Sequence, residues 1–233
     1  MNIFCLDHDP YISAEMHCDK HILKMVIEYA QLLSTAHRVL DGEYRIFTWT
    51  NEVFDAALGR LGPVKRTKPF WVLPGETASV NIDLFERTVN DELFHEHIGA
   101  VEVQGRKCYN STHHNHPCAI WARQTDANYH WLAQLFEGVL REYTKRYQKI
   151  HATEKLREFF LTPPKHIAHG QQTPFALAMP DEYKVDDEIL SYQNYYVGGK
   201  ARFAKWTNTT VPKWFLHRAD KDESHFARTN PIL

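Results

Sequence analysis

The clearest structural signal in the chain is the segment from Ser13 to Val39, which reads SAEMHCDKHILKMVIEYAQLLSTAHRV. Its apolar residues recur at spacings of three and four, the period of one face of an α-helix. They are Ile22, Met25, Val26, Tyr29, Leu32, Leu33 and Ala36. Ser13 is a favourable N-cap residue, and Gly42 follows shortly after the pattern ends. The sequence therefore predicts one long amphipathic helix over 13–39, with one face in the core.

Further helical patterns follow in the second half of the chain. A helix over 117–149 is predicted, with Pro117 at its first position and a break near Thr125. Shorter helices are expected over 153–161 and 186–206, the second interrupted at Gly198 and Gly199. The dominant pattern predicts an all-α fold, with a single helical domain over 1–233 and a loose polar tail over 217–233.

The region 41–112 has a different character. Glycine and proline interrupt its short apolar pieces, and we expect an irregular insertion within the helical domain. Val80, Leu84, Val89 and Leu93 indicate one helix over 78–97. The segment 98–103 has the composition of a short strand.

Composition excludes several classes of protein. The chain has 233 residues and a net charge of −2, which rules out a broadly basic protein but leaves room for a local positive surface. No apolar run approaches the roughly 18 residues of a membrane span. The first residues lack the basic and apolar regions of a signal peptide. The four cysteines form no C-x-x-C pair, so we expect a reduced cytoplasmic protein without a disulfide framework or membrane contact.

Positive charge is concentrated in three places. The clusters are Arg60, Lys65, Arg66 and Lys68; Arg141, Lys145, Arg146 and Lys149; and Lys200, Arg202 and Lys205. Aromatic residues lie near each of them. Phosphate contact combined with base stacking uses this mixture, and so does an ordinary protein surface, so composition alone leaves both interpretations open.

The polar face of the first predicted helix is more informative. Seven polar residues step by four and three and therefore lie along one line of the helix. They are His17, His21, Lys24, Glu28, Gln31, Thr35 and Arg38. Imidazole, amine and carboxylate groups together are suited to acid–base chemistry or anion binding. The alternative is a solvent-exposed face with ordinary ion pairs.

Metal and cofactor chemistry have weaker signals. His17 and His21 have the i, i+4 spacing of metal ligands, but the glutamate of the H-E-x-x-H motif is missing, and Lys20 sits directly before His21. Lys24 would repel a cation, and the histidines at 113, 114 and 116 are equally suited to a capping turn. Cys18 is predicted to be a buried thiol. No phosphate-binding glycine loop occurs, so the sequence predicts neither a metal nor a cofactor.

Three short motifs carry a resemblance to a known family. The run from Asp19 to Glu28 resembles the first helix of the pyrimidine-dimer DNA glycosylases of the phage endonuclease V type. Asn115-His116-Pro117, followed by Trp121, resembles their Asn-His-Pro element. Tyr195-Tyr196-Val197-Gly198-Gly199-Lys200 resembles their aromatic C-terminal motif. The chain is also similar, nearly end to end, to uncharacterised tailed-phage proteins.

The resemblance implies a compact helical fold and a specific chemistry. In this family the α-amine of the first residue attacks the sugar of a flipped pyrimidine nucleotide, and a glutamate on the first helix stabilises the cationic sugar. Carried over, the catalytic residues are Glu28, His21 and Lys24. The DNA- or substrate-binding residues are His17, Gln31, Arg38, His116, Tyr195, Tyr196 and Lys200. The expected partner is double-stranded DNA in the cytoplasm of a phage host.

The nucleophile and the reaction stay open at this point. The attacking amine is that of Met1, Asn2 or Lys24. The same fold suits a phage DNA-modifying transferase that adds an amino acid or amine to phosphorylated 5-hydroxymethyluracil. Glu28 or His21 would then deprotonate the amine, and Lys24 or Arg38 would hold the phosphate leaving group. A non-enzymatic DNA-binding protein and a metal-dependent hydrolase are the remaining alternatives.

Overall fold

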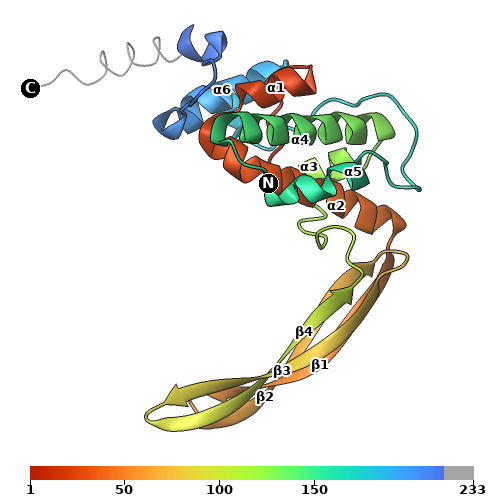
Figure 1. The fold of residues 1–233 in the computed structure, drawn as a ribbon, viewed down its shortest axis with the longest axis vertical. Helices are drawn as coiled ribbons and strands as arrows, with labels where there is room; N and C mark the ends of the chain where they lie inside the picture. The colour runs from red at the N-terminus through yellow and green to blue at the C-terminus, as the bar shows by residue number, and fades with distance from the viewer. Residues whose placement is uncertain (218–233) are drawn as a thin grey trace, which may run out of the picture.

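The computed structural model describes residues 1–217, in which a helical body carries a long β arm (Figure 1). The body contains α1 (Pro10–Met16), α2 (Asp19–Asp41), α3 (Pro117–Ala122), α4 (Asp126–Tyr147), α5 (Arg157–Phe160) and α6 (Glu188–Lys200), with short 3₁₀ turns at Ala152–Leu156, Asp181–Tyr183 and Ala201–Phe203. The arm contains β1 (Glu43–Asp55), β2 (Arg60–Val72), β3 (Thr77–Val89) and β4 (Glu92–Gln104). Within the described residues, no helix is long and apolar enough to cross a membrane. The predicted tail beyond residue 217 lies outside the described residues.

The core of the body forms where α2 and α1 pack against α4. The predicted apolar face of α2 is confirmed, because all seven of its residues are buried. Leu132, Leu135, Phe136 and Val139 of α4 are buried opposite them. Burial of these large side chains supplies most of the driving force for folding the body.

The predicted helix over 13–39 is wrong at its beginning. The chain forms two helices, and His17 and Cys18 between them have extended backbone conformations. Asp9, not Ser13, caps α1 by accepting from the amides of Tyr11 and Ile12. Ser13 is buried inside α1, where its hydroxyl bonds to the backbone of Phe4 and Leu6. The apolar residues that show the helical period begin at Ile22, after the break, so the pattern did not determine where the long helix begins.

The predicted interruption of the second helical region is confirmed. Pro117 begins α3, and Thr125 separates α3 from α4. The Thr125 hydroxyl accepts from the amide of Asn128 at 3.2 Å, a standard N-cap bond. The break between the two helices therefore depends on local residues, and the sequence alone predicts it.

The β arm contradicts the predicted all-α fold and the predicted irregular insertion. Four antiparallel strands lie in the order β2-β1-β4-β3. β1 and β2 pair along their whole length, from Glu43 opposite Val72 to Asp55 opposite Arg60. β3 and β4 pair in the same way, and Glu52 opposite His97 links the two hairpins. The region 41–112 is therefore a regular β structure that projects from the end of α2 (Figure 1).

The helix predicted over 78–97 is wrong because its spacing satisfies two periods. Val80 and Leu84 are four residues apart, which suits a helix, but Ile82 between them completes the alternation of a strand. Val80 pairs with Val101 across the hairpin. The turn residues Asn90 and Asp91 have positive φ values of 52° and 64°, the conformation of a two-residue type I′ hairpin turn. The strand predicted over 98–103 lies within β4.

A buried ion pair joins the arm to the body. Arg38 of α2 donates to both carboxylate oxygens of Glu76 at 2.9 and 3.0 Å, and both side chains are fully buried. Arg38 also donates to the carbonyl oxygens of Trp71, Cys108 and Tyr109. Burial opposes ionisation of Glu76, but these contacts outweigh it and lower the pKa of its carboxyl. Arg38 was predicted to contact substrate; instead, it holds the base of the arm.

Candidate functional site

Glu28 and Lys24 lie on the part of α2 that the body leaves uncovered. Lys24 Nζ is 3.3 Å from Glu28 Oε1, and the side chains are 72% and 14% exposed. The carboxylate is thus largely shielded, while the amine reaches solvent. Leu23 and Ile27 are exposed beside them at 47% and 39%. A shielded carboxylate next to an amine and two apolar side chains can stabilise a cationic centre on a bound ring.

His116 and the Met1 amine share the environment of Glu28. The pKa of His116 is lowered, first by burial and then by the positive charges of the Met1 amine and His113, while Glu28 opposes the shift. The Met1 amine and Glu28 also act on buried Cys118, whose pKa is raised mainly by burial. His116 Nδ1 accepts from the amide of Cys118 at 3.2 Å, so neutral His116 carries its proton on Nε2. The fold therefore gathers an amine, a carboxylate and an imidazole donor.

His17 is a structural residue. It is fully buried, and Tyr29 Oη, which accepts from the Phe4 amide, lies 2.6 Å from its Nε2. His17 Nδ1 donates to the Ser13 carbonyl at 2.7 Å. Burial lowers the pKa of His17 to about 4, so the ring is neutral near pH 7. The predicted role of His17 in DNA contact does not fit this position, because both nitrogens are already bonded inside the core.

His21 lies close to the candidate site, and contacts with buried aromatic residues fix the position of its ring. Its ring stacks on Phe4 at 4.2 Å, and its Nδ1 lies 2.5 Å from Tyr196 Oη. Burial lowers the pKa of His21 to about 2, with smaller effects from the charges of His17, Lys200 and Lys24. The ring is therefore a weak base, better suited to positioning than to proton abstraction. Tyr196 is fully buried and accepts from the Cys18 amide, so it also supports the site from inside.

Tyr195 and Lys200 bring α6 to the same region. Lys200 Nζ lies 2.8 Å from Tyr195 Oη and 4.3 Å from the ring centroid. The Tyr195 ring stacks against Phe4 at 6.1 Å. Both residues are partly exposed, as is Gln31 on α2. Of the predicted site residues, those that keep exposed surface are Lys24, Glu28, Gln31, His116, Tyr195 and Lys200.

Asn110 is a residue that the sequence did not indicate. Its Oδ1 is buried and has no hydrogen-bond partner among the described residues. The Asn110 loop is fastened to α2, because the Tyr109 amide donates to Ser34 Oγ and the Thr112 amide donates to Thr35 Oγ1, each at 3.1 Å. An unpaired buried acceptor is unfavourable, which makes Asn110 a candidate acceptor for a ligand N–H.

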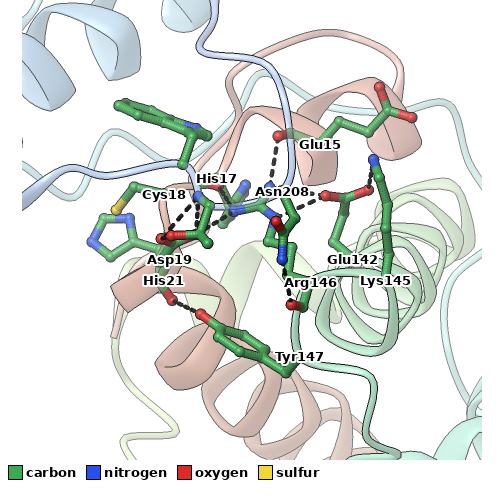
Figure 2. A network of polar contacts seen from close by, with 12 residues as sticks. Glu15, His17, Cys18, Asp19, His21, Glu142, Lys145, Arg146, Tyr147 and Asn208 are labelled. Atoms are coloured by element: carbon green, nitrogen blue, oxygen red, sulfur yellow. Dashed lines mark hydrogen bonds and ion pairs between the residues drawn. The ribbon is translucent and has the colours of Figure 1, made fainter.

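Figure 2 shows the polar network that holds the beginning of α2 in place. The buried Arg146 side chain donates to the carbonyls of His17 at 2.7 Å and Glu15 at 3.0 Å. It also pairs with Glu142 at 2.9 Å and with Asp19 Oδ1 at 3.1 Å. Asp19 in turn accepts from the Thr207 hydroxyl at 2.7 Å. Arg146 thereby ties the α1–α2 junction to α4, and Asp19 acts as part of this support.

Metal binding has no structural support in the described part of the chain, where no group of three His, Cys, Asp or Glu residues could hold an ion. His17 and His21 are each bonded to a different buried tyrosine, Tyr29 and Tyr196 respectively. All four cysteines are buried and free. The groups that the candidate site offers for chemistry are its amines, carboxylate and imidazole.

Comparison with known proteins gives no match: no family model, no curated protein and no solved structure matches the chain. What the protein does must be inferred from its own side chains.

The buried histidines make stability depend on pH. The pKa of His17 is about 4 in the folded state and about 6.5 in an unfolded chain. The unfolded state therefore binds more protons between these values, and the free energy of unfolding falls as pH drops through this window. Each such histidine contributes a slope of about 1.4 kcal/mol per pH unit. We expect His17→Gln to reduce the slope by that amount in urea titrations between pH 7 and 4.5. An unchanged slope would contradict the assignment, and exposed His166→Gln is the control.

Proposed function

We propose that this protein is an enzyme that acts on a pyrimidine nucleotide flipped out of duplex DNA, most simply as a DNA glycosylase. The observation that carries the proposal is the shielded Glu28 carboxylate, which pairs with the Lys24 amine and shares two neighbours with the Met1 amine. Lys24 Nζ lies 3.3 Å away, and the charge of the Met1 amine reaches the same pair of neighbours, His116 and Cys118. The order of the motifs along the chain supports the same proposal.

The chemistry uses an amine as nucleophile. The amine nitrogen attacks C1′, and the bond from C1′ to the base breaks with its electron pair leaving on the base, which takes a proton from the amine. The nitrogen lone pair then forms the C1′=N bond as the C1′–O4′ bond breaks, and O4′ takes a proton from solvent. The product is a Schiff base at C1′ that keeps the remaining amine proton on nitrogen. Both steps pass through positive charge at C1′. A carboxylate in a partly dry position stabilises that charge more strongly than water does.

The surrounding residues suit a flipped base. Exposed Leu23 and Ile27 offer apolar contact to a base. The His116 Nε2–H can donate to a base carbonyl or to the departing base. Tyr195 and Lys200 provide a ring and a positive charge for the adjoining nucleotide and its phosphate.

Borohydride trapping tests the proposal directly. The protein is incubated with a duplex that carries an ultraviolet pyrimidine dimer, borohydride is added, and the intact mass is measured. Reduction of the Schiff base should give a protein–DNA adduct, and peptide mapping should place it on Met1 or Lys24. The matched variant Lys24→Arg keeps the positive charge and loses the primary amine. Absence of an adduct with the wild type would contradict amine-based glycosylase chemistry.

One observation favours a second reaction on the same kind of substrate. The charges of Lys200 and Lys24 both act on His21, so two cations lie within electrostatic range of one ring in the site. Such a pair suits a phosphate leaving group. The alternative is a transferase that joins an amino acid or amine to phosphorylated 5-hydroxymethyluracil in DNA. Release of pyrophosphate or phosphate from that DNA only when an amine is present, without a borohydride adduct, would favour it over the glycosylase.

A further inference from the structure

The two hairpins of the β arm carry opposite charge. On β2, one edge of the sheet, Lys65, Arg66, Thr67 and Lys68 are four consecutive exposed residues. No carboxylate among the described residues pairs with Lys65, Arg66 or Lys68. The β3–β4 hairpin carries one arginine in its strands against five carboxylates, Asp83, Glu86, Glu92, Glu96 and Glu102. The basic segment, residues 65–68, is therefore a local anion-binding surface on a chain with a net charge of −2.

The basic segment is connected to the candidate site through aromatic contacts. Trp71 of β2 lies 5.1 Å from the ring of His114, two residues before His116. Tyr44 of β1 packs on Trp71 at 4.9 Å. Counted outward from Trp71, Lys68 is three residues away and Lys65 is six, which is about 10 and 20 Å at the rise of a strand. Glu28 lies ten residues before Arg38, whose side chain donates to the Trp71 carbonyl, and this adds about 15 Å of helix. The basic segment is therefore up to roughly 25 to 35 Å from Glu28, or about seven to ten base pairs at about 3.4 Å each.

We propose that residues 65–68 bind the phosphate backbone of duplex DNA up to about ten base pairs to one side of the target nucleotide. This inference rests on the proposed action on DNA. Cationic side chains on an exposed strand suit phosphate contacts, which position a duplex without reading its sequence. The acidic β3–β4 hairpin would face away from the duplex and oppose binding in the reverse orientation.

The composition of β2 argues against strand pairing with a second copy of the chain. Pro63 and Pro69 lie on either side of the basic segment and have no backbone N–H to donate. Proline and lysine on an edge strand are the residues that prevent edge-to-edge association. The arm projects from the body (Figure 1), so β2 is free to meet an extended partner such as a duplex.

The test compares two triple variants of the full chain that lose the same charge. K65Q/R66Q/K68Q removes the segment, and K149Q/K155Q/K213Q removes three exposed cations of the body. Binding to an undamaged 30-base-pair duplex is measured by fluorescence anisotropy over a range of salt concentrations. The arm variant should bind at least about tenfold more weakly at 100 mM salt, with a log–log salt slope lower by about three. The body variant should match the wild type.

Duplex length gives a second, independent readout. With the target placed three, six, nine or twelve base pairs from one end, wild-type affinity should rise until that flank reaches about ten base pairs. The arm variant should show no such rise. Equal salt slopes for the wild type and the arm variant would overturn the proposal. So would self-association of the wild type that the arm variant loses while DNA binding is unchanged, since the segment would then join two copies.

The failure of this proposal can be told apart from the failure of the proposed function. A borohydride adduct with unchanged salt slopes removes the arm proposal alone. A lower salt slope of DNA binding in the arm variant, without any borohydride adduct in the wild type, would support the arm as a DNA contact. The same result would contradict the glycosylase chemistry.

Discussion

The variant Glu28→Gln is expected to lose base excision by about 10²- to 10³-fold, the effect of removing one group that stabilises charge in a transition state. Glutamine keeps the shape of the side chain and removes its negative charge. Lys24, the ion-pair partner, is 72% exposed, and such a pair adds at most about 1 kcal/mol to stability. The variant should therefore fold and bind DNA normally. Single-turnover release of the base, together with the dissociation constant for the duplex, measures both quantities.

Glu137 provides a matched control for this experiment. It also lies on a helix, is 17% exposed, and forms an i, i+4 pair with Arg141 at 2.8 Å. Glu137→Gln should leave the excision rate unchanged. Full activity in Glu28→Gln, or an equal loss in both variants, would show that Glu28 is not the catalytic carboxylate.

The variant Arg146→Met is expected to lower the free energy of unfolding by about 3–5 kcal/mol, the effect of removing one partner from a buried ion pair. Methionine fills similar volume but leaves buried Glu142 without its main partner and leaves the carbonyls of Glu15 and His17 without donors. Urea unfolding followed by circular dichroism gives the measurement. The control Arg141→Met removes an arginine that is 63% exposed from the same helix.

Stability losses below 1 kcal/mol in Arg146→Met would contradict the assignment of Arg146 as the central support of the α1–α2 junction. A second variant, Asp19→Asn, distinguishes the ion pair from the carbonyl contacts. It keeps the bonds of Arg146 to Glu15 and His17, so its loss should be smaller than that of Arg146→Met.

Local sequence signals predicted the helices well where capping and periodicity agree. Pro117 and Thr125 set the boundaries of α3 and α4, and the apolar face of α2 is buried as its spacing indicates. These features depend on neighbours within one or two turns, so the sequence contains the relevant information.

The β arm was not predicted, because strand pairing is a long-range property. Val80 and Leu84 satisfy a helical period by themselves, and only their partners on β4 show that the segment is a strand. Asn90 and Asp91 are residues that favour a turn. Together with the alternation of apolar and polar residues on both sides, they would have indicated a β-hairpin. The same limit applies to Glu76, whose pairing with Arg38 across the base of the arm could not be read from spacing.

The sequence by itself determined that Lys24 and Glu28 share one face of a helix, because a period of 3.6 residues places them one turn apart. Only the tertiary structure decided which members of that polar face meet solvent. Arg146 of α4, Tyr29 of α2 and Tyr196 of α6 enclose the start of the face, and Glu76 of the arm encloses its end. Periodicity defines a direction around one helix axis, whereas burial depends on which distant segment packs there.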